Sequence, residues 1–347
     1  MFFKKQRSLI GLDIGTHCVK AAEMTQSGNE TVLTAYGQND VVSEGSRADA
    51  IVDLLQGRNF RTRRVATAVS GKSVIVRYLT MIQMSDDDLK NAIRFEADKY
   101  IPFDVEEVVL DAQRLADAPG GKGGVGENEM RVLLVAVKRS VIDEHVQLLQ
   151  SIGLEPHIVD VDAFALGNAY ELSGTLGAGA DDAERAVALI DVGANKTNIN
   201  VLRGGTSYFT REIYLGGEDF TSAISKRMGC EVHQAELLKR DPGENEEALR
   251  DAVLPSIDDL GNEIHLSFDY FENQFDRAVD DVLLSGGGAS LPLVETTFEK
   301  IFEKRTRAWD PTENLKIDEA AVDAAALRGN AAQLAVAVGL ASRIRKD

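Results

Sequence analysis

The stretch Ile10-Gly11-Leu12-Asp13-Ile14-Gly15-Thr16 has an echo in Ile190-Asp191-Val192-Gly193-Ala194-Asn195-Lys196-Thr197, and together they decide the fold. Each copy is an apolar strand that runs into Asp-x-Gly, then a tight turn, then a second alternating strand. Such a turn lets backbone N–H groups approach a phosphate, while the carboxylate reaches a hydrated Mg²⁺ ion. Two of these hairpins predict a duplicated fold, and two that face each other would form a nucleotide cleft.

The composition excludes several classes of protein. With 347 residues, 44% of them hydrophobic, the chain can form two lobes that each bury a core. A formal net charge of −18 repels phosphate backbones, so nucleic acid is not expected as a partner. Cys18 and Cys230 have no metal-ligand or disulfide spacing, and no apolar run approaches the roughly 18 residues that span a membrane. The first residues lack the apolar core of a signal peptide, so we expect a cytoplasmic protein.

Residues 1–72 are predicted to form the first part of a first lobe. After the hairpin, residues 31–35 are expected to form a strand, residues 47–56 a helix and residues 65–69 a further strand. The apolar face of the helix is expected to hold Ala48, Ile51, Val52 and Leu55. This β-β-β-α-β order is typical of a mixed sheet with a helix packed on it.

Residues 73–161 are predicted to form an inserted subdomain of strand-helix-strand-strand-helix-strand order. Its first helix begins after the N-cap Ser85 and ends at Ile101-Pro102-Phe103, because the residue before a proline leaves the α region. The second helix is expected to begin with Ser140 as its cap and to stop at Gly153. A Gly-rich linker at 119–126 is predicted to be a mobile loop. The expected strands are 73–82, 105–115, 131–137 and 157–161.

Residues 162–185 are predicted to complete the first lobe with a helix at 163–172 and a linker. The second lobe, 186–325, repeats the hairpin, adds a strand at 206–213 and continues into a helical part at about 218–275. A buried strand at 281–284 then runs into a triple glycine and a helix. The Ala-rich residues 326–347 are expected to return to the first lobe as a C-terminal helix.

Further candidate site residues lie outside the two hairpins. The triple glycine indicates a turn beside a phosphate or adenine, or a plain strand-to-helix turn. Glu236 and Lys239 share one helix face, where they would contact ribose and adenine or form a surface ion pair. The candidate cofactor-binding residues are Asp13, Gly15, Thr16, Lys20, Asp191, Gly193, Asn195, Lys196, Thr197, Gly216, Gly217, Glu236, Lys239, Gly286, Gly287 and Gly288, with Asp13 and Asp191 expected to bind Mg²⁺ through water.

In this order the elements resemble the actin, heat-shock 70 and hexokinase ATPase superfamily. The resemblance implies an α/β fold of two duplicated lobes with mixed sheets flanked by helices, and ATP with Mg²⁺ as cofactors. It makes Asp13-Ile14-Gly15-Thr16 the first phosphate motif, Asp191-Val192-Gly193 with Thr197 the second, and Ser285-Gly286-Gly287-Gly288-Ala289 the adenosine motif. Ala194 stands where many of these ATPases carry a second glycine, which predicts weak hydrolysis at most. The resemblance also places residues 161–163 at one of two hinge positions. Asp162, within it, is the candidate to position an attacking water.

The insert is similar to the SHS2-like insert of the division protein FtsA and, more closely, of the PilM family of type IV pilus assembly proteins. The run Glu96-Ala97-Asp98-Lys99-Tyr100-Ile101-Pro102-Phe103, followed by an acidic Val-rich strand, carries the PilM resemblance. It implies an ATP-binding cytoplasmic protein at the inner membrane, held there by partners. The N-terminal cytoplasmic peptide of PilN would bind a groove between the first lobe and the insert. Phe95, Tyr100, Ile101 and Phe103 would line that groove or pack in the core.

Three functions stay open at this point. The first is an ATP-bound adaptor of the pilus platform, for which other platform proteins, assembly ATPases and further copies of the chain are additional candidate partners. The second is an FtsA-like division filament protein, disfavoured because residues 343–347 have almost no apolar face for a membrane helix. The third is a small-molecule kinase, for which no general-base aspartate in a substrate pocket is identified.

Overall fold

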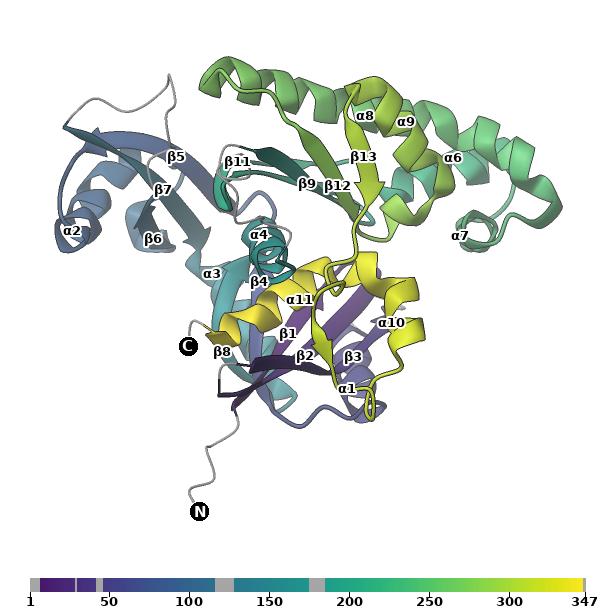
Figure 1. The fold of residues 1–347 in the computed structure, drawn as a ribbon, viewed down its shortest axis with the longest axis horizontal. Coiled ribbons are helices and arrows are strands. Elements are labelled where there is room, and N and C mark those ends of the chain that lie inside the picture. The colour runs from purple at the N-terminus through teal and green to yellow at the C-terminus, as the bar shows by residue number, and fades with distance from the viewer. Residues whose placement is uncertain (1–6, 29, 42–45, 116–127, 175–184, 346–347) are drawn as a thin grey trace.

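The structure, a computed structural model, describes residues 7–28, 30–41, 46–115, 128–174 and 185–345. Its described residues form two lobes, one above the other in Figure 1, with a smaller insert beside them. The linker at 119–126 and most of the linker before the second lobe lie outside the described residues.

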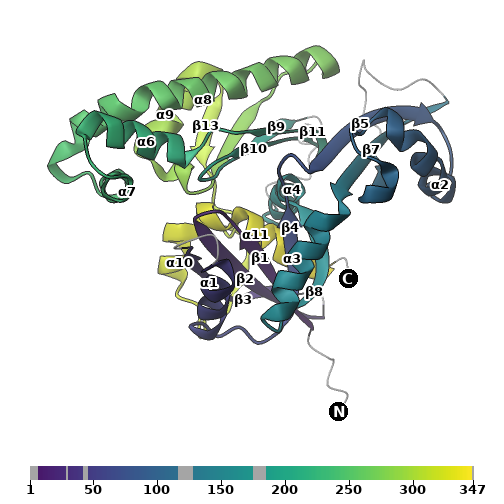
Figure 2. The ribbon, with the colours of Figure 1, turned by 180° about the vertical axis from the view of Figure 1, so that it is seen from behind.

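The first lobe is built on a mixed sheet in the order β14-β3-β2-β1-β4-β8. On one face α1 (Arg47–Gln56) and α3 (Arg139–Ser151) cover it, as Figure 2 shows from behind. Leu54 of α1 and Leu149 of α3 are buried there against Ile10 and Val65 of the sheet. The strands are β1 (Arg7–Ile14), β2 (Cys18–Ser27), β3 (Glu30–Asp40), β4 (Arg64–Val69), β8 (Glu155–Val161) and β14 (Lys316–Ile317).

The second lobe repeats this plan in the order β11-β10-β9-β12-β13. In both lobes the first two strands pair antiparallel, and the first strand also pairs in parallel with a later strand. The predicted duplication is therefore confirmed. The strands are β9 (Ala186–Val192), β10 (Thr197–Arg203), β11 (Thr206–Ile213), β12 (Asp281–Ser285) and β13 (Arg305–Ala308), and the helices are α6 (Gly217–Met228), α7 (Val232–Arg240), α8 (Glu246–Phe275) and α9 (Pro292–Phe302).

Two helices lie between the lobes, α4 (Asp162–Leu172) and α11 (Ala335–Ala341). They approach so closely that a Cβ atom on Gly339 would lie 1.8 Å from the carbonyl oxygen of Ala165. A Cβ atom on Gly11 of β1 would lie 2.0 Å from the carbonyl oxygen of Ala337. Small residues thus allow the backbones to pack together, as the Ala-rich composition predicts.

The C-terminal stretch Ala324–Ile344 is long and apolar enough to cross a membrane by length and composition alone. All residues of α11 within it are buried against the rest of the fold, which is the usual position of a core helix. The expected single tail helix is instead divided into α10 (Ala324–Asn330) and α11, with a tighter turn between them.

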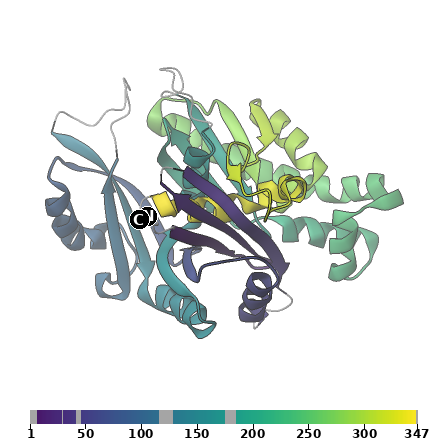
Figure 3. The same ribbon diagram turned by 60° about the horizontal axis from the view of Figure 1, so that its bottom comes forward.

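The insert is a sheet in the order β5-β7-β6 with α2 (Asp86–Glu96) packed on it. Figure 3 shows it to one side of the first lobe. Its strands are β5 (Val74–Ile82), β6 (Val108–Arg114) and β7 (Glu129–Lys138). Ser85 caps α2 as expected, since its hydroxyl oxygen accepts a hydrogen bond from the Asp88 N–H at 3.2 Å.

The structure corrects several expectations. β8 pairs with β4 and α3 packs on the first lobe, so the predicted boundary of the insert at 161 is wrong and its sheet ends with β7 at Lys138. β14 pairs with β3, so the chain returns to the first lobe before the expected residue 325. α3 begins at Arg139 rather than after a Ser140 cap, and the buried face of α1 holds Ala50, Ile51 and Leu54.

Candidate functional site

A cavity of about 1150 Å³ lies between the lobes. Both hairpin turns, the triple glycine and the helices α6 and α7 line it, although they are far apart in the sequence. The structure brings together Asp13, Gly15, Thr16, Lys20, Asp162, Asp191, Gly193, Asn195, Lys196, Gly217, Glu236, Lys239, Gly286, Gly287 and Gly288 of the predicted residues. The volume is slightly above the usual range of small-molecule sites, about 300–1,000 Å³, so the cleft has room for a nucleotide.

The two hairpin turns have the same local geometry. The Gly15 N–H donates to the Cys18 carbonyl at 3.2 Å, and the Gly193 N–H donates to the Lys196 carbonyl at 2.9 Å. A Cβ atom at either glycine would lie within 2.8 Å of that carbonyl oxygen. Glycine is therefore required at both turns for the same steric reason, and each turn presents its backbone to the cavity.

Two carboxylates stand at the ends of β1 and β9. Asp13 accepts a hydrogen bond from Lys20 Nζ at 3.0 Å, and Asp191 accepts one from Ser285 Oγ at 3.1 Å. Burial raises the pKa of Asp191 to about 6; Lys20 opposes the rise, while Asp13 and Asp162 add to it. The cleft therefore holds an excess of buried negative charge that a cation would relieve.

The residues present fit a hydrated Mg²⁺ ion. No group of three or more histidine, cysteine or acidic side chains in the described ranges is close enough to hold a bare metal ion. Asn198, on β10 directly opposite Asp191, lines the cavity, and its buried Oδ1 has no hydrogen-bond partner among the described residues. Mg²⁺ binds oxygen ligands and keeps several waters, so Asp13, Asp191 and Asn198 would hold those waters beside phosphate groups.

We expect the pKa of Asp191 to make the Mg²⁺-dependent affinity for ATP fall at low pH. A hydrated cation favours the ionised carboxylate, so each pH unit below about 6 should weaken Mg²⁺-dependent binding up to about tenfold. Titration calorimetry between about pH 5 and pH 8, with Mg²⁺ or with a chelator, measures this. The matched variant Asp191→Asn should lose the dependence, and an unchanged dependence in it would contradict the assignment.

The same pKa has a consequence for stability without ligand. The folded pKa of Asp191 is about 6 against an ordinary value of 3.8, so the nucleotide-free fold binds this proton more tightly than the unfolded chain does. The contribution is fully present below about pH 3.8 and is lost as the pH rises through about 6.

The triple glycine reaches the cavity directly beside Asp191. Gly286 has a φ of +89°, and a Cβ atom there would lie 2.4 Å from the Val192 carbonyl oxygen and 2.8 Å from Asp191 Oδ1. A Cβ atom would collide with the end of β9, so glycine is required at this position for a steric reason.

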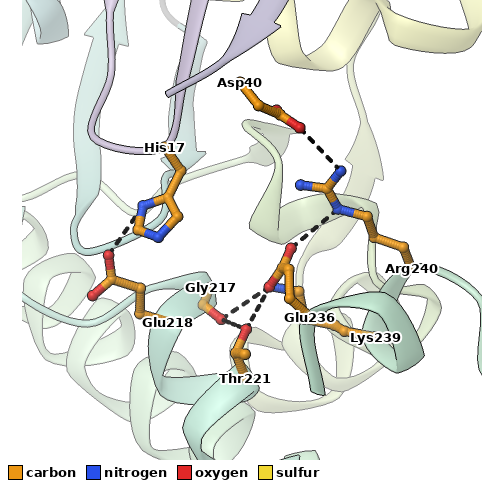
Figure 4. Close-up of polar contacts among 8 residues, drawn as sticks. All are labelled: His17, Asp40, Gly217, Glu218, Thr221, Glu236, Lys239 and Arg240. Carbon is orange, nitrogen blue, oxygen red and sulfur yellow. Dashed lines mark hydrogen bonds and ion pairs between the residues drawn. The ribbon is translucent and has the colours of Figure 1, made fainter. Parts of the chain in front are cut away.

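The Glu236–Lys239 pair is bound to the neighbouring helix rather than free on the surface (Figure 4). Lys239 Nζ donates to the Gly217 carbonyl at 3.2 Å and to Thr221 Oγ1 at 2.8 Å. Thr221 in turn donates to Glu236 at 2.6 Å. The network fixes one wall of the cavity at the junction of α6 and α7.

Two polar contacts bridge the lobes at the rim of the cavity, as Figure 4 shows. His17 of the first lobe lies 3.2 Å from Glu218 of α6, and Asp40 at the end of β3 lies 3.7 Å from Arg240. No local sequence pattern relates these cross-lobe partners, so they were not predicted. Other lining residues that were not predicted are Ser70, Thr221, Ser222, Ser290, Pro292 and Gln333.

Two predicted cofactor residues do not line the cavity. Thr197 is buried, and its hydroxyl donates to the Leu215 carbonyl at 2.8 Å. Side chains alternate along a strand, so the neighbouring Asn198 faces the cavity instead. Gly216 precedes α6, and its N–H donates to Asp219 at 2.8 Å.

The predicted partner-binding residues lie in the insert, away from this cavity. Phe95 is 84% exposed, whereas Ile101 is buried in the core of the insert. Tyr100 and Phe103 are partly buried, and Lys138 Nζ lies 4.6 Å from the centre of the Phe103 ring. Ile101 therefore packs in the core of the insert, and Phe95 is the predicted residue that is free to meet a partner.

A family profile described as type IV pilus assembly protein PilM matches residues 11–345. The chain belongs to the PilM family. A solved structure of the PilM–PilN type IV pilus biogenesis complex contains a chain that is 29% identical, with 96% of this chain and 98% of that chain covered and a TM-score of 0.83. The predicted PilM resemblance is confirmed.

Other relatives extend the comparison beyond the PilM family. The cell division protein FtsA of Streptococcus pneumoniae is 24% identical over an alignment of 354 positions that covers 87% of this chain and 75% of FtsA. A structure of MreB5 of Spiroplasma citri bound to ADP has a TM-score of 0.52, is 13% identical and covers 98% of this chain and 97% of its own. The PilM-family chain therefore has the actin-like ATPase fold that its hairpins predict.

Proposed function

We propose that this protein is the ATP-binding component of the type IV pilus inner-membrane platform and binds the N-terminal cytoplasmic peptide of PilN. The observation that carries the proposal is the likeness, over 96% of the chain, to the solved PilM–PilN complex. The bound peptide would hold the protein at the inner face of the cytoplasmic membrane. Other platform proteins, assembly ATPases and further copies of the chain remain proposed partners.

The nucleotide half of the proposal rests on the cleft. Its two glycine turns supply backbone N–H groups for phosphates, and Lys20 and Lys196 add positive charge. Asp13, Asp191 and Asn198 fit a hydrated Mg²⁺ ion. The ADP in the MreB5 structure supports a nucleotide in a cleft of this fold. ATP with Mg²⁺ is thus the cofactor that we propose.

We expect hydrolysis to be slow. Asp162, the candidate to position water, is held by Lys196 Nζ at 2.9 Å. A carboxylate in an ion pair is a weaker hydrogen-bond acceptor for an attacking water than a free one. An adaptor needs ATP to be held rather than turned over, so this arrangement suits the proposed role.

The partner half of the proposal places the PilN peptide between the first lobe and the insert. Phe95 offers the most exposed aromatic ring of the predicted residues, while Tyr100 and Phe103 support that end of α2. An extended apolar peptide gains affinity from such exposed aromatic surface.

Co-purification with full-length PilN in detergent tests the partner. The proposal expects the protein to be retained by PilN and lost when PilN lacks its N-terminal cytoplasmic segment. Retention by both forms, or by neither, would contradict it.

The second candidate function is an FtsA-like filament protein, favoured by the FtsA similarity over 87% of the chain. Electron microscopy of the purified protein with ATP and Mg²⁺ separates the two. We expect no filaments, whereas filaments without PilN binding would favour the division role. A screen of phosphate acceptors would expose a kinase.

A further inference from the structure

Glu212, at the end of β11, joins parts of the molecule that no motif connects. Its Oε1 accepts a hydrogen bond from the Gly71 N–H at 2.8 Å and lies 3.4 Å from Lys196 Nζ. Its Oε2 accepts a hydrogen bond from the Tyr214 hydroxyl at 3.2 Å. One carboxylate of the second lobe therefore contacts both the second phosphate turn and the backbone that leads into the insert.

Gly71 lies between β4 of the first lobe and β5 of the insert. Its φ of +93° is in the left-handed region, where glycine is favoured. The next residue, Lys72, places its ammonium group 5.3 Å from the centre of the Tyr214 ring. The base of the insert is thus attached to the second lobe at Glu212 and Tyr214.

Lys196 divides its charge between two carboxylates. Its ammonium group lies 2.9 Å from Asp162 and 3.4 Å from Glu212, and the longer contact is the weaker. Burial disfavours the charged form, yet Asp162 and Glu212 outweigh it and hold the pKa of Lys196 above its usual value. These side chains are no more than 23% exposed, so solvent screens the contacts only in part.

A second polar chain fixes the insert at another point. The Tyr78 hydroxyl of β5 lies 2.8 Å from Ser207 Oγ, and Ser207 donates to Asn200 Oδ1 at 2.7 Å. Asn200 is fully buried and donates to the Ala163 carbonyl of α4 at 2.6 Å. None of these residues lines the cavity. This series of hydrogen bonds would therefore hold the insert in place if the contact between Glu212 and Gly71 broke.

We propose that Glu212 couples occupancy of the terminal-phosphate position to the base of the insert. The inference rests on the proposed ATP binding. A phosphate at the second phosphate turn competes for Lys196, and Glu212, the weaker partner, loses its cation. Beside a phosphate the unpaired carboxylate is repelled, turns outward and releases the Gly71 N–H. ATP and ADP therefore favour different attachments of the insert that would bind the PilN peptide.

By linkage, the same free energy acts in both directions. A peptide that binds better to the released insert would raise the affinity for ATP by the factor by which ATP raises the affinity for the peptide. The coupling depends on two states that differ in the partners of Lys196. In one state the partners are Asp162 and Glu212, and in the other a phosphate replaces Glu212.

Hydrogen–deuterium exchange of the Gly71 amide tests the proposal, because that N–H is itself the contact. Overlapping fragments across residues 70–76 of the full-length protein are compared with saturating ATP·Mg²⁺ and with ADP·Mg²⁺. We expect exchange about fivefold faster with ATP in the wild type and equal rates in Glu212→Gln. The matched control is Glu263→Gln, which removes an exposed ion pair between α8 and Arg211, the neighbour of Glu212 on β11. This variant should keep the wild-type difference.

The outcomes separate this inference from the proposed function. Calorimetry on the same samples first establishes that ATP binds. If ATP binds and the Gly71 amide exchanges equally with ATP and ADP, or more slowly with ATP, the coupling is wrong while the nucleotide site stands. A difference that survives in Glu212→Gln would also overturn it. If no ATP binds, both proposals fall.

Discussion

Replacing Gly339 by alanine is expected to lower the free energy of unfolding by about 3 kcal/mol or more. The added Cβ atom would lie 1.8 Å from the Ala165 carbonyl oxygen and 2.6 Å from its carbon. Both atoms belong to backbone, which cannot rotate away as a side chain can, so α4 and α11 must separate. Urea denaturation followed by circular dichroism measures the loss.

Gly329→Ala is the matched control for that substitution. Gly329 is exposed in α10, and a Cβ atom there would meet nothing within 4 Å. Alanine is the better helix former, so we expect a gain of about 0.5–1 kcal/mol. Equal effects of the two substitutions would show that the lobes are not joined by the close packing of α4 and α11.

Asp13→Ala is expected to weaken binding of ATP·Mg²⁺ about 100-fold, or about 2.7 kcal/mol. The variant loses a carboxylate that would hold the hydrated cation, and Lys20 loses its ion-pair partner at 3.0 Å. Burial disfavours the charged form of Lys20, and Asp13 is the main group that raises the pKa of this ammonium. Without Asp13 the ammonium group loses the partner that holds it beside the first hairpin turn.

Titration calorimetry with and without Mg²⁺ measures this loss. The control Asp49→Ala changes an exposed aspartate of α1 outside the cavity and should bind ATP as the wild type does. Wild-type affinity in Asp13→Ala would show that the first hairpin turn does not bind the nucleotide.

The sequence predicts elements best where local chemistry sets their ends. α6 ends at Met228 because Gly229 takes the left-handed conformation that stops a helix, and this glycine is visible in the sequence. The short polar β13 and β14 carry no hydrophobic period and were missed. The hydrophobic period of a segment predicts a strand but not the strand with which it pairs. For this reason β8 was assigned to the insert, although it pairs with β4 of the first lobe.

The site was predictable where glycine and aspartate share a tight turn. The backbone approaches so closely at these turns that only glycine fits, and this requirement leaves a visible sequence pattern. The pattern correctly placed Asp13, Asp191 and the triple glycine in one cavity. The contacts across the lobes, such as that of Asp40 with Arg240, depend on tertiary structure and leave no local pattern. Glu212 was missed for the same reason, since its partners Gly71 and Lys196 come from distant segments.

Titration of the nucleotide-free and the ATP·Mg²⁺-saturated protein with the N-terminal peptide of PilN tests whether this protein is an ATP-bound adaptor. We expect one peptide and one ATP per chain, a micromolar peptide affinity that changes with nucleotide, and no measurable loss of ATP during the titration. Binding of ATP without any binding of the peptide in either state would contradict the adaptor role.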